Sequence, residues 1–192
     1  KIGYVAAMGL DNSEVTGGID AFALGIYSVN PDAKVYVKVT NSWYDPKGEE
    51  EAAKTLLNMN CDVIAQHCDT VYPQTLAQEK GVYSIGYNSD MSKEAPEACL
   101  CSVIWNWSAY YTSAVQSVID GTWDGSNYYG GMNENLVSIT PVADFAADTT
   151  QEKVNVAKQQ ILSGKNGVFD GVIETNTGAT VGTAGKTLED SA

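Results

Sequence analysis

Aromatic and polar side chains collect where apolar runs of the sequence end. The candidate ligand contacts of this kind are Trp43, Gln66, His67, Asp69, Asp90, Trp105 and Asn106. Indole rings offer flat apolar faces on which a ring can stack, and carboxylates and amides exchange hydrogen bonds with ring amines or sugar hydroxyls. A few placed polar groups among aromatic rings is the usual make-up of a small-molecule site. The pattern predicts non-covalent ligand binding; the alternative is that the tryptophans are core residues and that Asp90 caps a turn.

Catalysis is the second hypothesis, and it depends on the sole histidine. His67 is a candidate base that Asp69 or Asp90 would orient, with Cys68 or Ser89 as the nucleophile. Neighbouring side chains of a strand point to opposite faces, however, which separates His67 from Cys68. The chain also lacks the common phosphate-loop, nucleophile-elbow and zinc-protease signatures. We therefore predict no catalytic residues and no enzyme.

The four cysteines do not have the spacing of a structural zinc site. Cys61, Cys68, Cys99 and Cys101 form no C-x-x-C pair, and His67 is the only histidine that could join them. We predict neither a metal nor a cofactor. Cys61 and Cys101 adjoin apolar runs and are expected to be buried as small hydrophobes. Spacing leaves the disulfide pairing open.

Composition narrows the class of ligand. The chain has 192 residues, 44% of them hydrophobic, which is enough for a core, and its formal net charge is −13. It has no apolar run of about 18 residues that would span a bilayer, and a duplex nucleic-acid binder needs a basic surface. All eleven basic residues are lysines. Since arginine normally recognises phosphate and carboxylate groups, its absence favours a neutral ligand, unless genomic base composition alone explains it.

Strand-like and helix-like segments alternate along the chain. The expected strands cover residues 2–7, 34–40, 61–66, 81–86, 100–104, 136–141 and 168–173, with an aromatic strand and loop at 123–132. The expected helices cover residues 13–28, with Ser13 as the cap, and 45–59, 73–80, 108–120 and 150–163. This order predicts an α/β fold, a doubly wound parallel sheet with helices on both faces. Ligands of such sheets lie beyond the carboxyl ends of the strands, where the candidate contacts are.

Several motifs also resemble one known family. In order they are K-I-G-Y-V, N-S-W-Y-D-P, D-V-I-A-Q-H, E-K-G-V-Y-S-I-G-Y-N-S-D-M-S, V-I-W-N-W-S-A-Y-Y, V-I-D-G-T-W and Y-Y-G-G-M. Over residues 1–175 the chain resembles the basic membrane protein family, the substrate-binding lipoproteins of ABC importers. The characterised ligands of that family are purine nucleosides or bases.

The resemblance implies an architecture of two Rossmann-like lobes, that of a type I periplasmic-binding protein. Residues 1–99 would form the second, ligand-binding lobe. Residues 100–124 would be the strand and helix that cross back to a first lobe, which this chain lacks, and 125–174 would return to the second lobe. Residues 175–192 are expected to be a flexible tail. Lys1 leads directly into a core strand, so we expect the chain to be a piece of a longer protein.

The resemblance also implies partners and some residue roles. Asp90 matches an aspartate that holds ribose hydroxyls in nucleoside-binding relatives. Trp105 stands where those relatives have a ribose-contacting lysine, which favours a free purine base. His67 and Asp69 replace a small glycine-rich stretch and would line the same cleft. The implied partners are a purine base or nucleoside, an ABC permease and the first lobe, but no nucleic acid.

The implied location is extracytoplasmic, as a cell-surface lipoprotein or a periplasmic protein. Two alternatives stay open. One is a Rossmann-like or flavodoxin-like enzyme that uses His67 with Asp69 or Asp90. The other is a ligand-sensing domain of the same fold.

Overall fold

A computed structural model describes residues 1–9, 11–165 and 167–188. Its main sheet has six strands in the order β2-β1-β3-β4-β5-β6; the first five are parallel and β6 runs antiparallel to β5. The strands are β1 (Ile2–Ala6), β2 (Val35–Val39), β3 (Val63–Gln66), β4 (Tyr83–Asn88), β5 (Cys99–Trp105) and β6 (Val137–Ile139). The helices are α1 (Ser13–Val29), α2 (Pro46–Asn58), α3 (Tyr72–Glu79), α4 (Ser108–Ile119) and α5 (Thr150–Leu162). The α/β fold with a mostly parallel sheet is thus as predicted.

Two apolar layers cover the two faces of the sheet. On one face, α2 and α3 pack over a cluster that includes the fully buried Leu56 and Ile64. On the other face, α1 packs through Val15 against Tyr4 and Ala65. The central strands β1 and β3 are therefore buried on both faces, as crossover helices require, whereas the edge strand β2 is partly exposed. The parallel direction brings the carboxyl ends of β1, β3 and β4 to one edge of the sheet.

The first helix begins differently from the prediction. Asn12, not Ser13, is the cap residue: its Oδ1 accepts a hydrogen bond from the backbone N–H of Val15 at 3.1 Å. Asn12 has an extended backbone (φ −101°), as a cap needs, while Ser13 is already helical. Both residue types favour this position, so sequence alone did not separate them.

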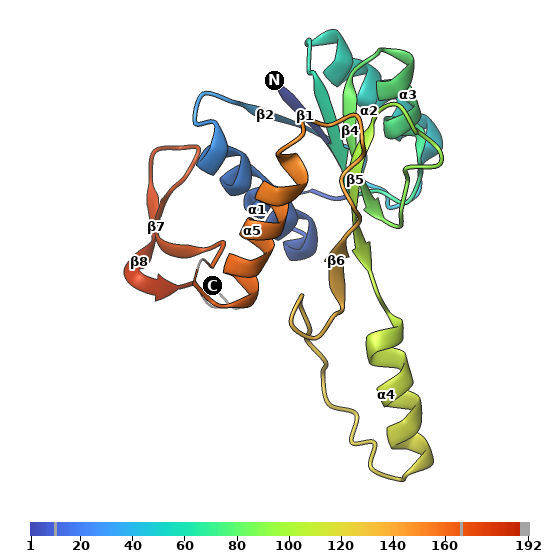
Figure 1. The fold of residues 1–192 in the computed structure, drawn as a ribbon, viewed down its shortest axis with the longest axis vertical. Coiled ribbons are helices and arrows are strands. Elements are labelled where there is room, and N and C mark those ends of the chain that lie inside the picture. Colours follow the sequence, from blue (N-terminus) through green and yellow to red (C-terminus); the bar gives the residue numbers. More distant parts are fainter. Residues whose placement is uncertain (10, 166, 189–192) are drawn as a thin grey trace.

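Helix α4, between β5 and β6, forms an arm that projects beyond the sheet (Figure 1). None of its residues is buried, and Tyr111, Val115, Val118 and Ile119 are all more than half exposed. The chain then returns to β6 along an irregular path, without the aromatic strand that we expected at 123–132.

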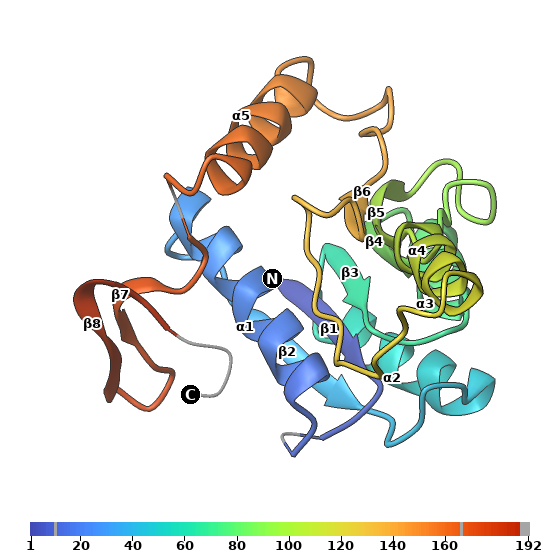
Figure 2. The same cartoon turned by 90° about the horizontal axis from the view of Figure 1, so that it is seen from below.

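The last segments lie on the α1 side of the sheet. Helix α5 and the hairpin of β7 (Asp170–Glu174) and β8 (Thr180–Thr187) both lie beside α1 in Figure 2. Strand β8 falls where we expected a loose tail, because the close approach of Gly182 to the carbonyl of Gly171 lets the strands pair. Residues 189–192 of that expected tail lie outside the description. None of the helices described is long and apolar enough to cross a membrane.

Candidate ligand-binding site

His67 lies at the centre of an aromatic group at the carboxyl edge of the sheet. It directly follows β3, and its backbone N–H donates to the carbonyl of Val5 in β1 at 2.9 Å. Its Nδ1 lies 3.1 Å from the hydroxyl of Tyr4. Its ring centroid is 4.2 Å from that of Tyr87 and 5.9 Å from that of Trp43, in an edge arrangement. Four aromatic side chains from β1, β4 and the loops after β2 and β3 thus meet there.

Tyr87 extends this group toward the arm formed by α4. Its hydroxyl donates to Glu14 of α1 at 3.2 Å and accepts from the indole N–H of Trp105, also at 3.2 Å. Trp105 in turn stacks on Trp107, with ring centroids 5.3 Å apart and planes 16° from parallel. Trp107 is 44% exposed, so part of this stacked pair faces solvent. The cluster therefore presents flat apolar rings next to hydrogen-bonding groups.

The exposed polar groups of the same edge come from the ends of β3 and β4. Asn88 donates through Nδ2 to Oδ1 of Asp69 at 3.2 Å. The backbone N–H of Asp69 donates to the carbonyl of Trp43 at 2.9 Å, which joins two of the loops. The structure thus brings Trp43, His67, Asp69 and Trp105 of the predicted contacts into one connected group.

The other predicted contacts form their hydrogen bonds outside this group. Gln66 is 3% exposed, and its Nε2 donates to the carbonyl of Thr70 at 2.7 Å. Asp90 is exposed and accepts a hydrogen bond from the backbone N–H of Ser92, which lowers the pKa of its carboxyl. This is the turn-capping alternative. The amide of Asn106 donates to the carbonyl of Asn135 at 3.1 Å, so it bridges the strands at the root of the arm.

Burial fixes the charge state of the central histidine. His67 is 5% exposed, and this burial lowers its pKa to about 4, so the imidazole is neutral at physiological pH. Its Nε2 is buried and finds no hydrogen-bond partner among the described residues. Cys68 points to the opposite face, into the cluster under α2, and burial raises the pKa of its thiol to about 12. His67 and Cys68 therefore form no nucleophile–base pair, as the strand alternation predicted.

Sequence reasoning missed several members of the group, namely Tyr4, Glu14, Gly18 and Tyr87. Tyr4 and Tyr87 share a face of the sheet with His67, because Tyr4 is in register with Ala65, two residues before it. That alternation was available as a signal once the strand order was known. Glu14 and Gly18 come from α1, and no spacing in the sequence relates them to His67.

Gly18 leaves room for the imidazole. A Cβ at this position would lie 2.7 Å from Cε1 of His67, whereas one at Gly17 would meet nothing within 4 Å. We expect Gly17→Ala to stabilise the chain by about 0.5–1 kcal/mol through helix propensity. Gly18→Ala should be less stable than Gly17→Ala by about 1–3 kcal/mol, because the methyl group overpacks the layer. Urea unfolding of both variants measures the difference; equal stabilities would mean that α1 does not press on His67.

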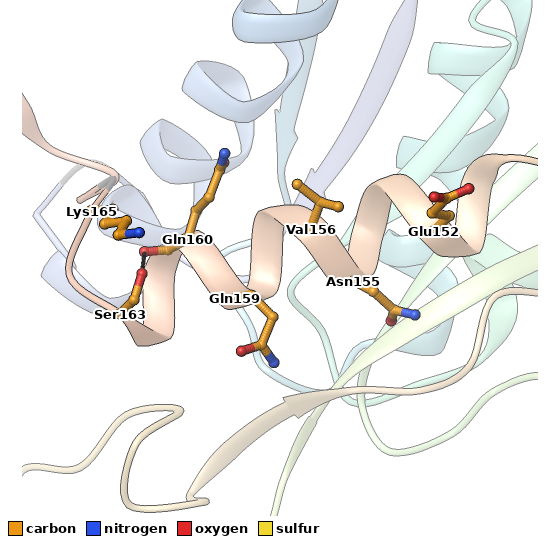
Figure 3. Close-up of a pocket in the computed structure, with 7 residues that line it drawn as sticks. All are labelled: Glu152, Asn155, Val156, Gln159, Gln160, Ser163 and Lys165. Carbon is orange, nitrogen blue, oxygen red and sulfur yellow. Dashed lines mark hydrogen bonds between the residues drawn. The ribbon is translucent and has the colours of Figure 1, made fainter.

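Two hollows lie away from this edge of the sheet. One, of about 350 Å³, runs along α5 between Glu152 and Lys165, and its lining comes from that helix and the residues just after it (Figure 3). The other, of about 470 Å³, lies at the amino ends of β3 and β4, beside Asp62 and Tyr83. Neither contains a residue of the aromatic group. Nor does the described part of the chain contain a group of three or more His, Cys, Asp or Glu residues that could hold a metal.

Comparison with known proteins gives a consistent picture. A family model described as ABC transporter substrate-binding protein PnrA-like matches residues 1–168. The chain is 36% identical over 188 residues to a purine-binding protein of Brucella abortus, covering 98% of this chain and 53% of that protein. It is 35% identical over 170 residues to a putative ABC transporter glucose-binding protein of Haloferax volcanii, covering 88% and 43%. A solute-binding protein of an ABC transporter from Aeropyrum pernix has a similar fold, with a TM-score of 0.70 at 15% identity, covering 91% and 57%.

These matches settle the family. The chain spans about half the length of the curated relatives it matches. The resemblance that the motifs suggested is confirmed, and so is the fold class. The family is one of substrate-binding proteins, which agrees with the prediction that the chain is not an enzyme. The chain belongs to the family of PnrA-like substrate-binding proteins of ABC transporters.

Proposed function

We propose that the protein is the extracytoplasmic solute-binding component of an ABC importer and that its ligand is a neutral purine base or nucleoside. The observation that carries this proposal is the connected group of Trp43, His67, Asp69 and Trp105 at the carboxyl edge of the sheet. The 36% identical relative is named a purine-binding protein, which supports the same ligand class.

The residues of the group suit such a ligand chemically. The rings of Trp43 and Trp105 offer faces for stacking a planar base. Asp69 and Asn88 offer an acceptor and a donor for ring amines or ribose hydroxyls. The neutral His67 adds no charge to the group, which suits an uncharged ligand. No lysine lies in a salt bridge with these groups in the described chain, which fits an uncharged ligand.

The exposed arm fits the two-lobe architecture. An apolar helix face with Val115, Val118 and Ile119 more than half exposed is stable only when something covers it. In the proposed function a first lobe covers α4, and closure of the two lobes encloses the ligand. Residues 100–124 then cross to that lobe and 125–174 return. The importer's permease would be the second partner. The whole protein would be a cell-surface lipoprotein or a periplasmic protein.

A glucose ligand is the second candidate, because the 35% identical relative is named a putative glucose-binding protein. Stacked indoles beside a carboxylate–amide pair also suit a sugar ring.

Calorimetric titration of the two-lobe protein with adenine, guanosine, inosine and glucose distinguishes these candidates. We expect saturable binding of a purine and a loss of about tenfold or more in affinity for Trp43→Ala, since a stacked aromatic face is removed. Tyr83→Ala, at the opposite edge of the sheet, is the control and should bind as the unmodified protein does. Binding heat with glucose and with none of the purines would show that the ligand is a sugar. The absence of binding heat with any purine would refute the purine assignment.

A further inference from the structure

A buried carboxylate with no role in ligand contact lies beneath the loops of the site. Glu49, in the first turn of α2, is fully buried. Its Oε1 accepts from the backbone N–H of Asp45 at 3.0 Å, and its Oε2 accepts from the hydroxyl of Thr70. Asp45 closes the loop after β2, and Thr70 belongs to the loop after β3. One side chain thus bonds to both loops that carry the site.

Thr70 is held from a second side. It is 6% exposed, and its carbonyl accepts from Nε2 of Gln66 at 2.7 Å. Gln66 also bonds to the amide oxygen of Gln74, whose own Nε2 donates to the carbonyl of Ile85 in β4 at 2.9 Å. This series of buried hydrogen bonds therefore ties the loop after β3 to α3 and β4. Gln66 therefore holds the loop after β3 in position and does not face the ligand.

Burial of the Glu49 carboxylate costs free energy unless its oxygens are hydrogen-bonded. Among the described residues no lysine lies within ion-pair distance of Glu49. Burial raises the pKa of the Glu49 carboxyl, and the nearby carboxylates of Asp45 and Asp69 raise it further. A buried polar group without good partners is destabilising, so both hydrogen bonds of Glu49 are needed to keep it there.

We propose that Glu49, Thr70 and Gln66 are positioning residues that clasp the two ligand loops together. The clasp sets the distance between Trp43 and the pair His67–Asp69. It thereby maintains the hydrogen bond from the backbone N–H of Asp69 to the carbonyl of Trp43. The consequence for ligand affinity rests on the proposed function. The positioning itself does not, and it can be measured without any ligand.

The test is amide hydrogen exchange of the ligand-free chain, read at Asp69. Thr70→Val removes the hydroxyl that Glu49 accepts and keeps the side-chain shape, whereas Thr70→Ser keeps the hydroxyl. We expect Thr70→Val to speed exchange of the Asp69 amide about tenfold, because it removes the hydrogen bond to Glu49 and the 3.4 Å one that the hydroxyl accepts from the backbone N–H of Tyr72. Thr70→Ser should stay within about twofold. The His67 amide, bonded to Val5 in the sheet, is the internal reference and should not change.

A second variant makes the result independent of how well Thr70→Val folds. Glu49→Met removes both carboxylate oxygens and therefore the acceptor for Thr70, and the double variant should exchange at Asp69 no faster than Glu49→Met alone. Unchanged exchange at Asp69 in both single variants would overturn the clasp. So would faster exchange at Asp69 and His67 alike, which is general loosening.

Adenine titration of the same variants separates the two proposals. If the clasp and the purine site are both correct, Thr70→Val binds adenine about tenfold more weakly and Thr70→Ser binds it normally. If the unmodified two-lobe protein binds no purine while the exchange pattern holds, the purine proposal fails and the clasp stands. If adenine binds equally well to all variants, the consequence of the clasp for ligand affinity is overturned.

Discussion

Lowering the pH from 7 to 5 is expected to reduce the contribution of His67 to stability by about 2 kcal/mol, and by about 3 kcal/mol at pH 4. Burial lowers the pKa of His67 from 6.5 to about 4. Between these two values the unfolded chain binds a proton that the folded chain excludes. Stability from this group is therefore complete above pH 6.5 and is lost as the pH falls toward 4.

The carboxylates also titrate in this range, so the comparison needs a variant without the imidazole. His67→Gln removes the titrating group, and the pH dependence of urea unfolding should be flatter for this variant by the amount above. Because His67 is the only histidine, its imidazole signals in proton NMR report its pKa directly. A midpoint near 6.5 in the folded chain would show that His67 is solvated and not at the centre of the aromatic layer.

The second large effect is expected in the core beneath α2. Leu56 is fully buried, and its side chain packs closely over β1. A Cβ added to Gly3 of β1 would lie 2.9 Å from the Cβ of Leu56. Leu56→Ala should lower the free energy of unfolding by about 2–5 kcal/mol, since it removes a buried side chain and leaves a cavity.

Leu57 provides the matched control on the same helix. It is only partly buried at the edge of that cluster. Leu57→Ala should therefore lower the free energy of unfolding by about 1 kcal/mol, because less apolar area leaves water on folding. Denaturant unfolding of the two variants measures the contrast. Equal losses would mean that α2 does not present Leu56 to the sheet.

The order of strands and helices was largely predictable because the core dictates it. The apolar runs Ile2–Ala6 and Val35–Val39 are short and are separated by a helical segment of crossover length, which favours parallel pairing. The arm was less predictable. Residues 123–132 contain aromatic residues typical of strands, but none of the residues that the structure describes pairs with them as a strand. Pairing, not propensity, decides whether such a segment becomes a strand.

The placement of the candidate ligand contacts was predictable only in part. Strand ends placed Trp43, His67 and Asp69 at one edge, since the carboxyl ends of parallel strands coincide. Gln66 was expected there too, but as the last residue of β3 it alternates to the α2 face and bonds inside. Tyr87 and Glu14 were missed because their roles depend on how α1 lies over the sheet. Side-chain hydrogen bonds between distant segments leave no periodic pattern in the sequence.

The central claim is that strand ends of this lobe hold a neutral ring against Trp43 and His67. NMR titration of the ¹⁵N-labelled 192-residue chain with adenine tests it most directly, because the single imidazole and four indole groups are resolved reporters. We predict saturable shifts of the His67 ring and of the Trp43 and Trp105 indole N–H signals, with Trp123 unaffected. Shifts confined to Trp123 or other distant groups, or no shift at millimolar adenine, would contradict the account.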